Sequence, residues 1–262
     1  MRESHDRAVI GVVGGVGPFA GLDLNQKIFD NTRTHREQDH LEVYLLSCSA
    51  RIADRTEYLL HPDAAENPAE AIYQVIEKLS RIGATVVGVP CNTSHSPPIW
   101  NRVLERMEES GLRVDLLNMI EETRLHIRAA HPDVETVGLL ATRGTYASRL
   151  YERHFERSGG LGVLVPGPDE QETVHAAIYD PAYGIKNHPN PISRRAVESL
   201  SETARRLIDR GAQAVVMGCT EIPLALRRVQ LQVPRIDTTV ILARALVARV
   251  APELLTPETG KA

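Results

Sequence analysis

The sequence predicts an α/β fold built from two similar halves, and two observations lead to this prediction. Short apolar runs alternate with longer amphipathic stretches along the 262 residues, which is typical of parallel βαβ units. The second half also repeats features of the first. Cys91 and Cys219 each follow an apolar run and are 128 residues apart, and Gly11 and Gly138, each inside such a run, are 127 apart. The two offsets agree within one residue, which indicates a duplicated α/β unit.

Eight apolar runs are the predicted strands. They are residues 9–13, 41–48, 85–89, 114–117, 136–140, 162–165, 214–217 and 235–236. Between them, residues 68–81 and 193–210 place apolar side chains on one helical face. Gly83 and Gly211 follow these two helices, where a C-terminal glycine cap belongs. Because open parallel sheets bind ligands at the carboxyl ends of their strands, we expect the two halves to face each other across one cleft.

Composition excludes several classes of protein. Hydrophobic residues make up 42% and charged residues 24%, as in ordinary globular chains. The net charge of −4 argues against a nucleic-acid partner, and no run of about 18 apolar residues predicts a membrane span. The N-terminus lacks the apolar core of a signal peptide, and three cysteines without a CxxC pair indicate neither a disulfide framework nor a zinc site. We therefore expect a cytoplasmic protein without a metal.

Two of the cysteines have an arrangement that suits proton transfer. Cys91 and Cys219 end predicted strands and precede polar residues that can start a helix, where the pKa of a thiol is lowered. A thiolate on one side of a substrate carbon and a thiol on the other would interconvert enantiomers. The carbanion needs hydrogen-bond donors. Three side chains that follow the cysteines are candidate donors: Asn92, Thr93 and Thr220. Cys48 has no counterpart in the other half and is interpreted as structural.

Three segments resemble the aspartate/glutamate racemase family. They are GGVGP (residues 14–18), PCNTSH (90–95) and GCTEIPL (218–224). The resemblance extends from residue 9 to about residue 248. It implies two flavodoxin-like α/β/α domains related by pseudo-two-fold symmetry, with the active site in the cleft between them. It also implies that Cys91 and Cys219 are the two acid/base catalysts, that no cofactor is used, and that the enzyme is a homodimer.

The same resemblance assigns substrate-binding residues. RIADRTEYLL (51–60) resembles a segment of aspartate racemases and places Arg55 at the side-chain carboxylate of the substrate, with Arg51 as the competitor. The planar fork of arginine suits a carboxylate. HAAIYDPAYGIKNHP (175–189) places Lys186 near the substrate, in a loop rich in glycine and proline.

Two further polar residues, Thr142 and Glu221, each have two expected roles. By resemblance Thr142 binds the substrate carboxylate, while Thr142 and Thr145 are also expected to cap the next helix. Glu221 either orients a catalytic group or favours a helix N-terminus by its charge. Gly15 and Gly17 are expected to supply backbone donors to a carboxylate. Val16 stands where the family commonly has methionine, which bears on substrate preference.

The glycine loop formally fits a dinucleotide-binding fingerprint, with Gly15, Gly17 and Ala20 at the required spacing. That fingerprint also needs an acidic residue at the end of the second strand, where this chain has the run Ser-Cys-Ser at 47–49. A dinucleotide cofactor is therefore not expected. Pyridoxal chemistry would need a Schiff-base lysine, for which Lys186 could be offered, but the cysteine pair makes it unnecessary.

The sequence thus predicts an amino-acid racemase, with aspartate as the first substrate and glutamate or another amino acid as the alternative. The first domain is expected at residues 1–117 plus 239–262 and the second at 118–238. A cysteine hydrolase or amidase remains open, with Cys91 as nucleophile and His95 as base, four residues apart on one helical face. Such an enzyme would not need Cys219. A non-catalytic binding module that uses the same cleft is the third alternative.

Overall fold

Two four-stranded parallel sheets form the framework of the computed structural model, which describes residues 8–157 and 160–257. The strand order is β2-β1-β3-β4 in one sheet and β6-β5-β7-β8 in the other. The strands are β1 (Ile10–Gly14), β2 (Val43–Ser47), β3 (Val86–Gly88), β4 (Asp115–Leu117), β5 (Thr136–Ala141), β6 (Gly162–Leu164), β7 (Ala214–Gly218) and β8 (Arg235–Asp237). All eight predicted strands are confirmed, with ends within two residues of the prediction.

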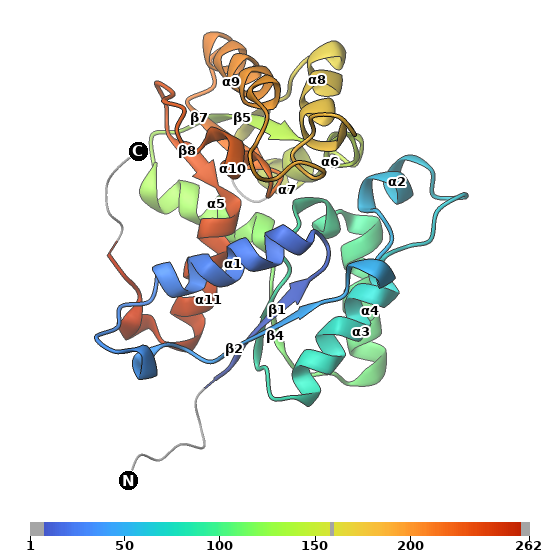
Figure 1. Cartoon of the computed structure of the whole chain (residues 1–262), viewed down its shortest axis with the longest axis vertical. Helices are drawn as coiled ribbons and strands as arrows, with labels where there is room; N and C mark the ends of the chain where they lie inside the picture. Colours follow the sequence, from blue (N-terminus) through green and yellow to red (C-terminus); the bar gives the residue numbers. More distant parts are fainter. Residues whose placement is uncertain (1–7, 158–159, 258–262) are drawn as a thin grey trace.

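Helices cover both sheets (Figure 1). They are α1 (Pro18–Asp30), α2 (Arg55–Leu60), α3 (Ala69–Arg81), α4 (Pro97–Ser110), α5 (Met119–Ala130), α6 (Arg143–Ala147), α7 (Leu150–Arg157), α8 (Pro168–Tyr179), α9 (Arg194–Asp209), α10 (Ile222–Leu226) and α11 (Thr238–Val250). Short 3₁₀ turns lie at η1 (Glu37–Asp39), η2 (Ser49–Arg51), η3 (Asn92–His95) and η4 (Pro252–Leu254). Among the helices that the structure describes, none is long and apolar enough to cross a membrane.

The two halves repeat one arrangement, as the sequence repeat predicts. Gly11 lies opposite Val87 in the β1–β3 pair, and Gly138 lies opposite Val215 in the β5–β7 pair. The central strands are buried on both faces, which explains why they read as continuous apolar runs rather than alternating ones. The predicted α/β fold of two similar units is confirmed.

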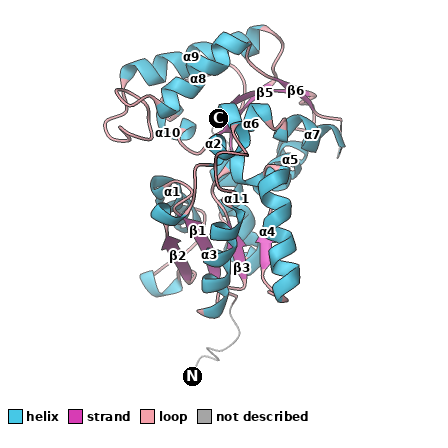
Figure 2. Ribbon diagram, turned by 90° about the vertical axis from the view of Figure 1, so that its right-hand side faces the viewer, coloured by secondary structure: helices cyan, strands magenta, loops and turns pink. Residues whose placement is uncertain are grey.

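Each sheet is enclosed by helices on its two faces. The first sheet packs against α3 and α4 on one face and against α1 and α11 on the other. The second packs against α8, α9 and α10 on one face and against α5 and α7 on the other. The two units lie one above the other in Figure 2. The carboxyl ends of the central strands lie toward the region where the units meet, because residues that follow β1, β3, β5 and β7 line one common cavity.

Two helices cross from one unit to the other. Helix α5 follows strand β4 of the first sheet, but its Ile120 and Ile127 pack with the core of the second sheet. Helix α11 follows β8 of the second sheet, but its Leu242 and Leu246 pack with Ile10 of the first. We propose the domain boundaries at 117/118 and 238/239, because each crossing helix begins within one residue of one of them.

Local signals define the helix ends. Ser193 accepts a hydrogen bond from Ala196 N at the start of α9. Asn118 and Asp237 each accept two backbone N–H groups at the equivalent starts of α5 and α11. Gly83 and Gly211 follow α3 and α9 with φ of +112° and +102°, which confirms the predicted glycine ends.

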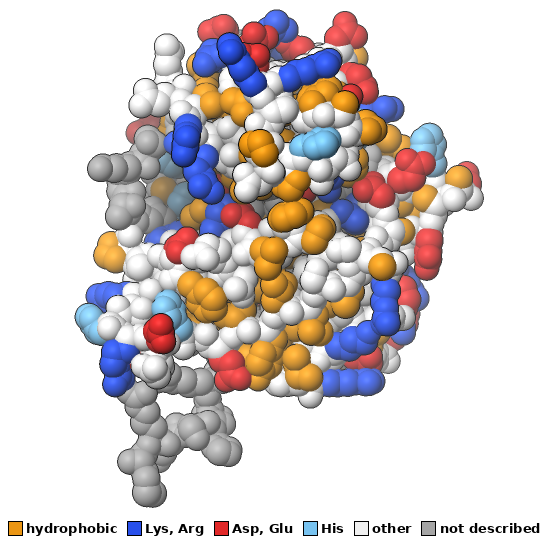
Figure 3. Space-filling view, viewed as in Figure 1, with side chains coloured by type: hydrophobic (Ala, Val, Ile, Leu, Met, Phe, Trp, Pro, Cys, Tyr) orange, Lys and Arg blue, Asp and Glu red, His pale blue; other side chains and the backbone are white. Residues whose placement is uncertain are grey.

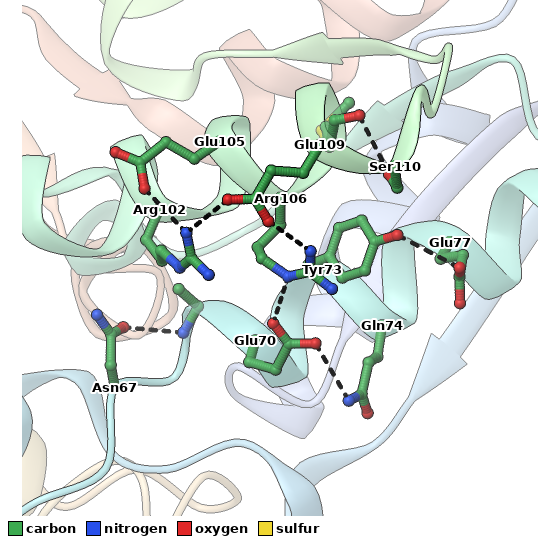
Figure 4. Close-up of polar contacts among 12 residues, drawn as sticks. Asn67, Glu70, Tyr73, Gln74, Glu77, Arg102, Glu105, Arg106, Glu109 and Ser110 are labelled. Atoms are coloured by element: carbon green, nitrogen blue, oxygen red, sulfur yellow. Dashed lines mark hydrogen bonds and ion pairs between the residues drawn. The ribbon is translucent and has the colours of Figure 1, made fainter.

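A charged network ties α3 to α4 on the outer face of the first unit (Figure 4). Arg106 pairs with Glu70 at 2.8 Å and with Glu109 at 2.7 Å, and its guanidinium lies 4.8 Å from the ring centre of Tyr73. Arg102 bonds Glu109 at 3.1 Å. On the face seen in Figure 3, positive and negative side chains are interspersed, and hydrophobic side chains gather over α1, where Phe19 and Leu22 are exposed.

Candidate active site

One small cavity lies at the carboxyl ends of the two central strands of each sheet. Val16 follows β1, Cys91 follows β3, Thr142 follows β5 and Cys219 follows β7, and all four line this cavity. The equivalent strand ends of the two units thus meet at one point, as parallel sheets that face each other require.

Ten of the residues singled out in the sequence come together here, with Tyr179. The complete lining is Val16, Arg55, Cys91, Asn92, Thr93, Thr142, Tyr179, Lys186, Cys219, Thr220 and Glu221. Gly15 and Gly17 flank Val16 in the chain but do not line the cavity. Arg51, the competitor of Arg55, is exposed and also lies outside the lining. Cys48 is partly exposed, follows the end of β2, and packs against the outer core of the first unit.

The thiol of Cys219 belongs to a network with the carboxylate of Glu221 and the ammonium group of Lys186. Its Sγ donates to Glu221 Oε2 at 2.8 Å, and Thr220 Oγ1 donates to the same oxygen at 3.1 Å. The other carboxylate oxygen pairs with Lys186 Nζ at 3.3 Å. Glu221 is thus placed to orient the catalytic candidate Cys219, and because it directly precedes α10 its charge also lies at a helix N-terminus.

The electrostatics of this network correct one expectation. Burial, together with the negative charge of Glu221, raises the pKa of Cys219 well above its ordinary value. The lowered thiol pKa expected for a cysteine near a helix start is therefore wrong at Cys219. Burial also disfavours the charged forms of Glu221 and Lys186. The ion pair between them outweighs burial, so the pKa of Glu221 is lowered and that of Lys186 is raised. Cys219 is the neutral thiol of a site whose carboxylate and ammonium stay charged.

This assignment predicts the order in which the thiols are alkylated. At pH 8 we expect iodoacetamide to modify Cys219 at least about tenfold more slowly than the half-buried Cys48, because burial hides the Cys219 thiol and raises its pKa. Peptide mass spectrometry after timed labelling measures both rates in one sample. Glu221→Gln removes the nearby negative charge and should accelerate labelling of Cys219 only. Equal rates at Cys219 and Cys48 in the unmodified chain would contradict the assignment.

Arg55 lies on the opposite side of the network, beside Cys91. It begins α2, is only 6% exposed, and donates to the carbonyls of Val16 and Ala53. Although burial disfavours its charge, the neighbouring Cys91 and Asp54 keep the pKa of Arg55 above its ordinary value. Its Nε is buried without a hydrogen-bond partner, a donor that an anionic ligand in the cavity could satisfy.

Four threonine hydroxyls close the seam between the units next to the cavity. Thr93 lies 2.9 Å from Thr145 and 3.2 Å from Thr142, measured between Oγ1 atoms, and Thr56 lies 3.3 Å from Thr142. A methyl group on Gly144 would lie 2.8 Å from Thr56 Cα, so only glycine permits this approach of α6 to α2. The expected side-chain capping by Thr142 is wrong: it precedes α6, but its hydroxyl joins the other threonines instead of a helix N–H.

His95 is not placed to activate a cysteine. Met119 N donates to its Nε2 at 3.2 Å, so its proton is on Nδ1, which donates to the backbone oxygen of Cys91 at 2.9 Å. The ring is buried and stacks on Trp100, and burial lowers the pKa of His95 to about 4. Both ring nitrogens are occupied by the backbone, which argues against the hydrolase alternative.

Sequence reasoning missed two contributors, Tyr179 of the second unit and Asp54 of the first. Tyr179 lines the cavity, and its hydroxyl donates to Asp54 Oδ2 at 3.1 Å across the seam. Lys186 Nζ lies 4.9 Å from the ring centre of Tyr179. Tyr179 lies in the same segment, residues 175–189, that predicted Lys186, so this motif could also have identified Tyr179. Asp54 directly precedes Arg55 and caps α2.

A larger open groove lies elsewhere, along α1, α11 and β8, and contains neither Cys91 nor Cys219. Its lysine, Lys27, pairs with Asp23 at 2.7 Å and with Asp237 at 2.9 Å. Because this groove lacks both cysteines, the smaller cavity is the candidate active site.

Comparison with known proteins agrees with this location. A profile of the Asp/Glu/Hydantoin racemase family matches residues 13–246, which include every residue of the cavity. The chain belongs to this family. It is therefore a racemase, an isomerase of amino acids, and the resemblance seen in the sequence is confirmed.

Individual relatives cover nearly the whole chain. The broad specificity amino-acid racemase RacX of Bacillus subtilis is 25% identical over 247 residues, covering 92% of this chain and 97% of that protein. The aspartate racemase of Picrophilus torridus superposes with a TM-score of 0.74 at 25% identity, over 93% of this chain and 94% of that one. The glutamate racemase RacE1 of Bacillus anthracis shares the fold, with a TM-score of 0.62 at 17% identity over 95% and 84% of the two chains.

Proposed function

We propose that this racemase interconverts L- and D-aspartate without a cofactor, by proton transfer between Cys91 and Cys219. The observation that carries the proposal is the meeting of two cysteines from equivalent strand ends in one cavity that also holds Arg55 and Lys186. The thiols would act from opposite faces of the α-carbon, one as base and one as acid. Asn92, Thr93, Thr142 and Thr220 would surround the substrate carboxylate that receives the developing charge.

The surroundings of the two thiols favour one starting state. Cys219 donates its proton to Glu221, whereas the side chain of Cys91 lies beside the guanidinium of Arg55. These contacts favour Cys219 as the proton donor and leave Cys91 as the base for one enantiomer. In that direction Cys91 removes the α-proton, and Cys219 protonates the other face of the α-carbon. Lys186 then balances the thiolate that forms at Cys219 beside Glu221.

The choice of aspartate depends on Arg55. We expect Arg55→Ala and Arg55→Lys to raise the KM for aspartate about tenfold to a hundredfold, since each loses hydrogen bonds from a planar fork to a charged carboxylate. Steady-state kinetics with chiral chromatography measures this effect. Arg51→Ala, an exposed arginine outside the cavity, is the matched control and should leave KM unchanged. An unchanged KM in the Arg55 variants would move the carboxylate role to Lys186.

A broader substrate range is the second candidate. One support is the similarity to the broad specificity racemase RacX, which extends over 97% of that protein. The other is the ion pair between Lys186 and Glu221. It neutralises one of the two cations, Arg55 and Lys186, that are expected to attract a side-chain carboxylate. Incubating the enzyme with L-aspartate, L-glutamate and a panel of neutral and basic L-amino acids separates the two candidates. Aspartate turnover far above the rest supports the first; similar kcat/KM values across the panel support the second.

We further propose that the enzyme works as a homodimer in the cytoplasm. The three free cysteines are compatible with a reducing compartment. Sedimentation analysis of the purified chain tests the dimer.

A further inference from the structure

A chain of buried hydrogen bonds runs past the cavity through both units. Tyr151 of α7 donates its hydroxyl proton to Asn92 Oδ1 at 2.5 Å. Asn92 Nδ2 donates to Thr238 Oγ1 at 3.3 Å, and Thr238 Oγ1 donates to the backbone oxygen of Met217 at 3.2 Å. All four residues are buried, with Tyr151 and Thr238 fully so. The chain therefore joins α7, η3, α11 and β7.

The direction of this chain is fixed by chemistry. The carbonyl of Met217 can only accept, so it takes the single hydroxyl hydrogen of Thr238. Thr238 can then only accept from Asn92, which turns the amide nitrogen toward Thr238 and the amide oxygen toward Tyr151. Burial raises the pKa of Tyr151 well above its ordinary value, so its hydroxyl stays a donor.

The fixed direction matters because Asn92 lines the cavity next to Cys91. Its amide nitrogen carries two hydrogens, and Thr238 takes one of them. The second remains available for an acceptor in the cavity. With the amide turned over, an oxygen would replace this donor and repel a carboxylate. The far end of the chain lies at Met217, two residues before Cys219, so the same bonds connect the segments that carry the two cysteines.

We propose that Tyr151 and Thr238 are positioning residues of the racemase: acting through Asn92, they hold an amide N–H toward the carboxylate of the bound amino acid. The proposal rests on the proposed function, since it places an amino acid in this cavity. Removal of the α-proton spreads negative charge onto the substrate carboxylate, so the donor is worth more in the transition state than in the bound substrate. Loss of either residue should therefore lower kcat more than it raises KM.

The test compares Tyr151→Phe and Thr238→Val with Thr238→Ser, which keeps the hydroxyl, and with Tyr73→Phe, a buried tyrosine on the outer helix α3. Racemisation is followed at saturating substrate, and thermal unfolding is recorded for each variant. We expect Tyr151→Phe and Thr238→Val to lower kcat about tenfold to a hundredfold, which is at most the loss of kcat seen when an oxyanion-hole donor is removed. The KM should change less than about threefold. Thr238→Ser and Tyr73→Phe should retain the wild-type kcat.

The same two variants made in an Asn92→Ala background distinguish positioning from packing. If the residues act through Asn92, neither lowers kcat further once its amide is gone. Equal losses in both backgrounds, or a wild-type kcat in Tyr151→Phe, would overturn the proposal while leaving the racemase function intact. If the wild-type enzyme exchanges the α-proton of no amino acid, the proposed function itself fails, and this result is recognised before any variant is compared.

Discussion

Cys91→Ala and Cys219→Ala are each expected to lower racemisation by about 10³-fold or more, because each removes one of the two groups that must exchange a proton with the α-carbon. Chiral chromatography of aspartate measures the loss. Both side chains line the cavity, so alanine should leave the fold in place. Cys48→Ala is the matched control, because Cys48 lies outside the cavity.

The two variants should also differ from each other. Each keeps one thiol and can still remove and return a proton on one face of the substrate. In D₂O we expect Cys219→Ala to exchange the α-proton of one enantiomer with retention, and Cys91→Ala to exchange that of the other. Full racemisation by either variant would rule out the two-base assignment.

Lys186→Met is expected to destabilise the fold by about 3 kcal/mol and to remove most activity. The lysine and Glu221 side chains are only 21% and 9% exposed, and removing one partner of a buried pair leaves the other charge uncompensated. Chemical denaturation at pH 7 measures the stability. Adding Glu221→Gln to Lys186→Met should recover much of the stability but not the activity, since Cys219 then lacks both charged neighbours. Lys78→Met, on the outer helix α3, is the control.

The pH dependence of this effect has a definite sign. The pKa of Glu221 is lowered in the folded state, so its ion pair contributes stability above the ordinary carboxyl pKa of about 4.3. This contribution is lost as the pH falls through the lower folded value. The difference in unfolding free energy between wild type and Lys186→Met should thus be full at pH 7 and shrink at pH 3. A difference that stays constant over this range would contradict a charged pair.

Much of the fold could be predicted because the central strands of each parallel sheet are covered by helices on both faces. Residues 214–217 form a continuous apolar run because β7 is buried on both faces, and the same holds for β1. The repeat was visible because the strands that carry Cys91 and Cys219 occupy equivalent positions in the two sheets. Arg55 and Lys186 were found through short motifs.

The remaining features depend on contacts between segments that are far apart in the sequence. The raised pKa of Cys219 arises mainly from burial, which distant parts of the chain create around its thiol, and the negative charge of Glu221 adds to it. Thr142 looked like a helix cap, but the packing of α2 and η3 against α6 gives its hydroxyl other threonine partners. Tyr151 and Thr238 meet Asn92 across 59 and 146 residues, which no spacing rule connects.

The transfer of solvent deuterium in early turnover tests the central claim most directly. The wild-type enzyme, free of added cofactor, is given L-aspartate in D₂O, and NMR follows the α-position of substrate and product before the reaction has proceeded far. With two bases, the proton taken by one thiol is not the one delivered by the other, so the account predicts deuterium in D-aspartate while the remaining L-aspartate keeps its proton. Deuterium appearing equally in both from the start, or product that retains the original proton, would contradict it.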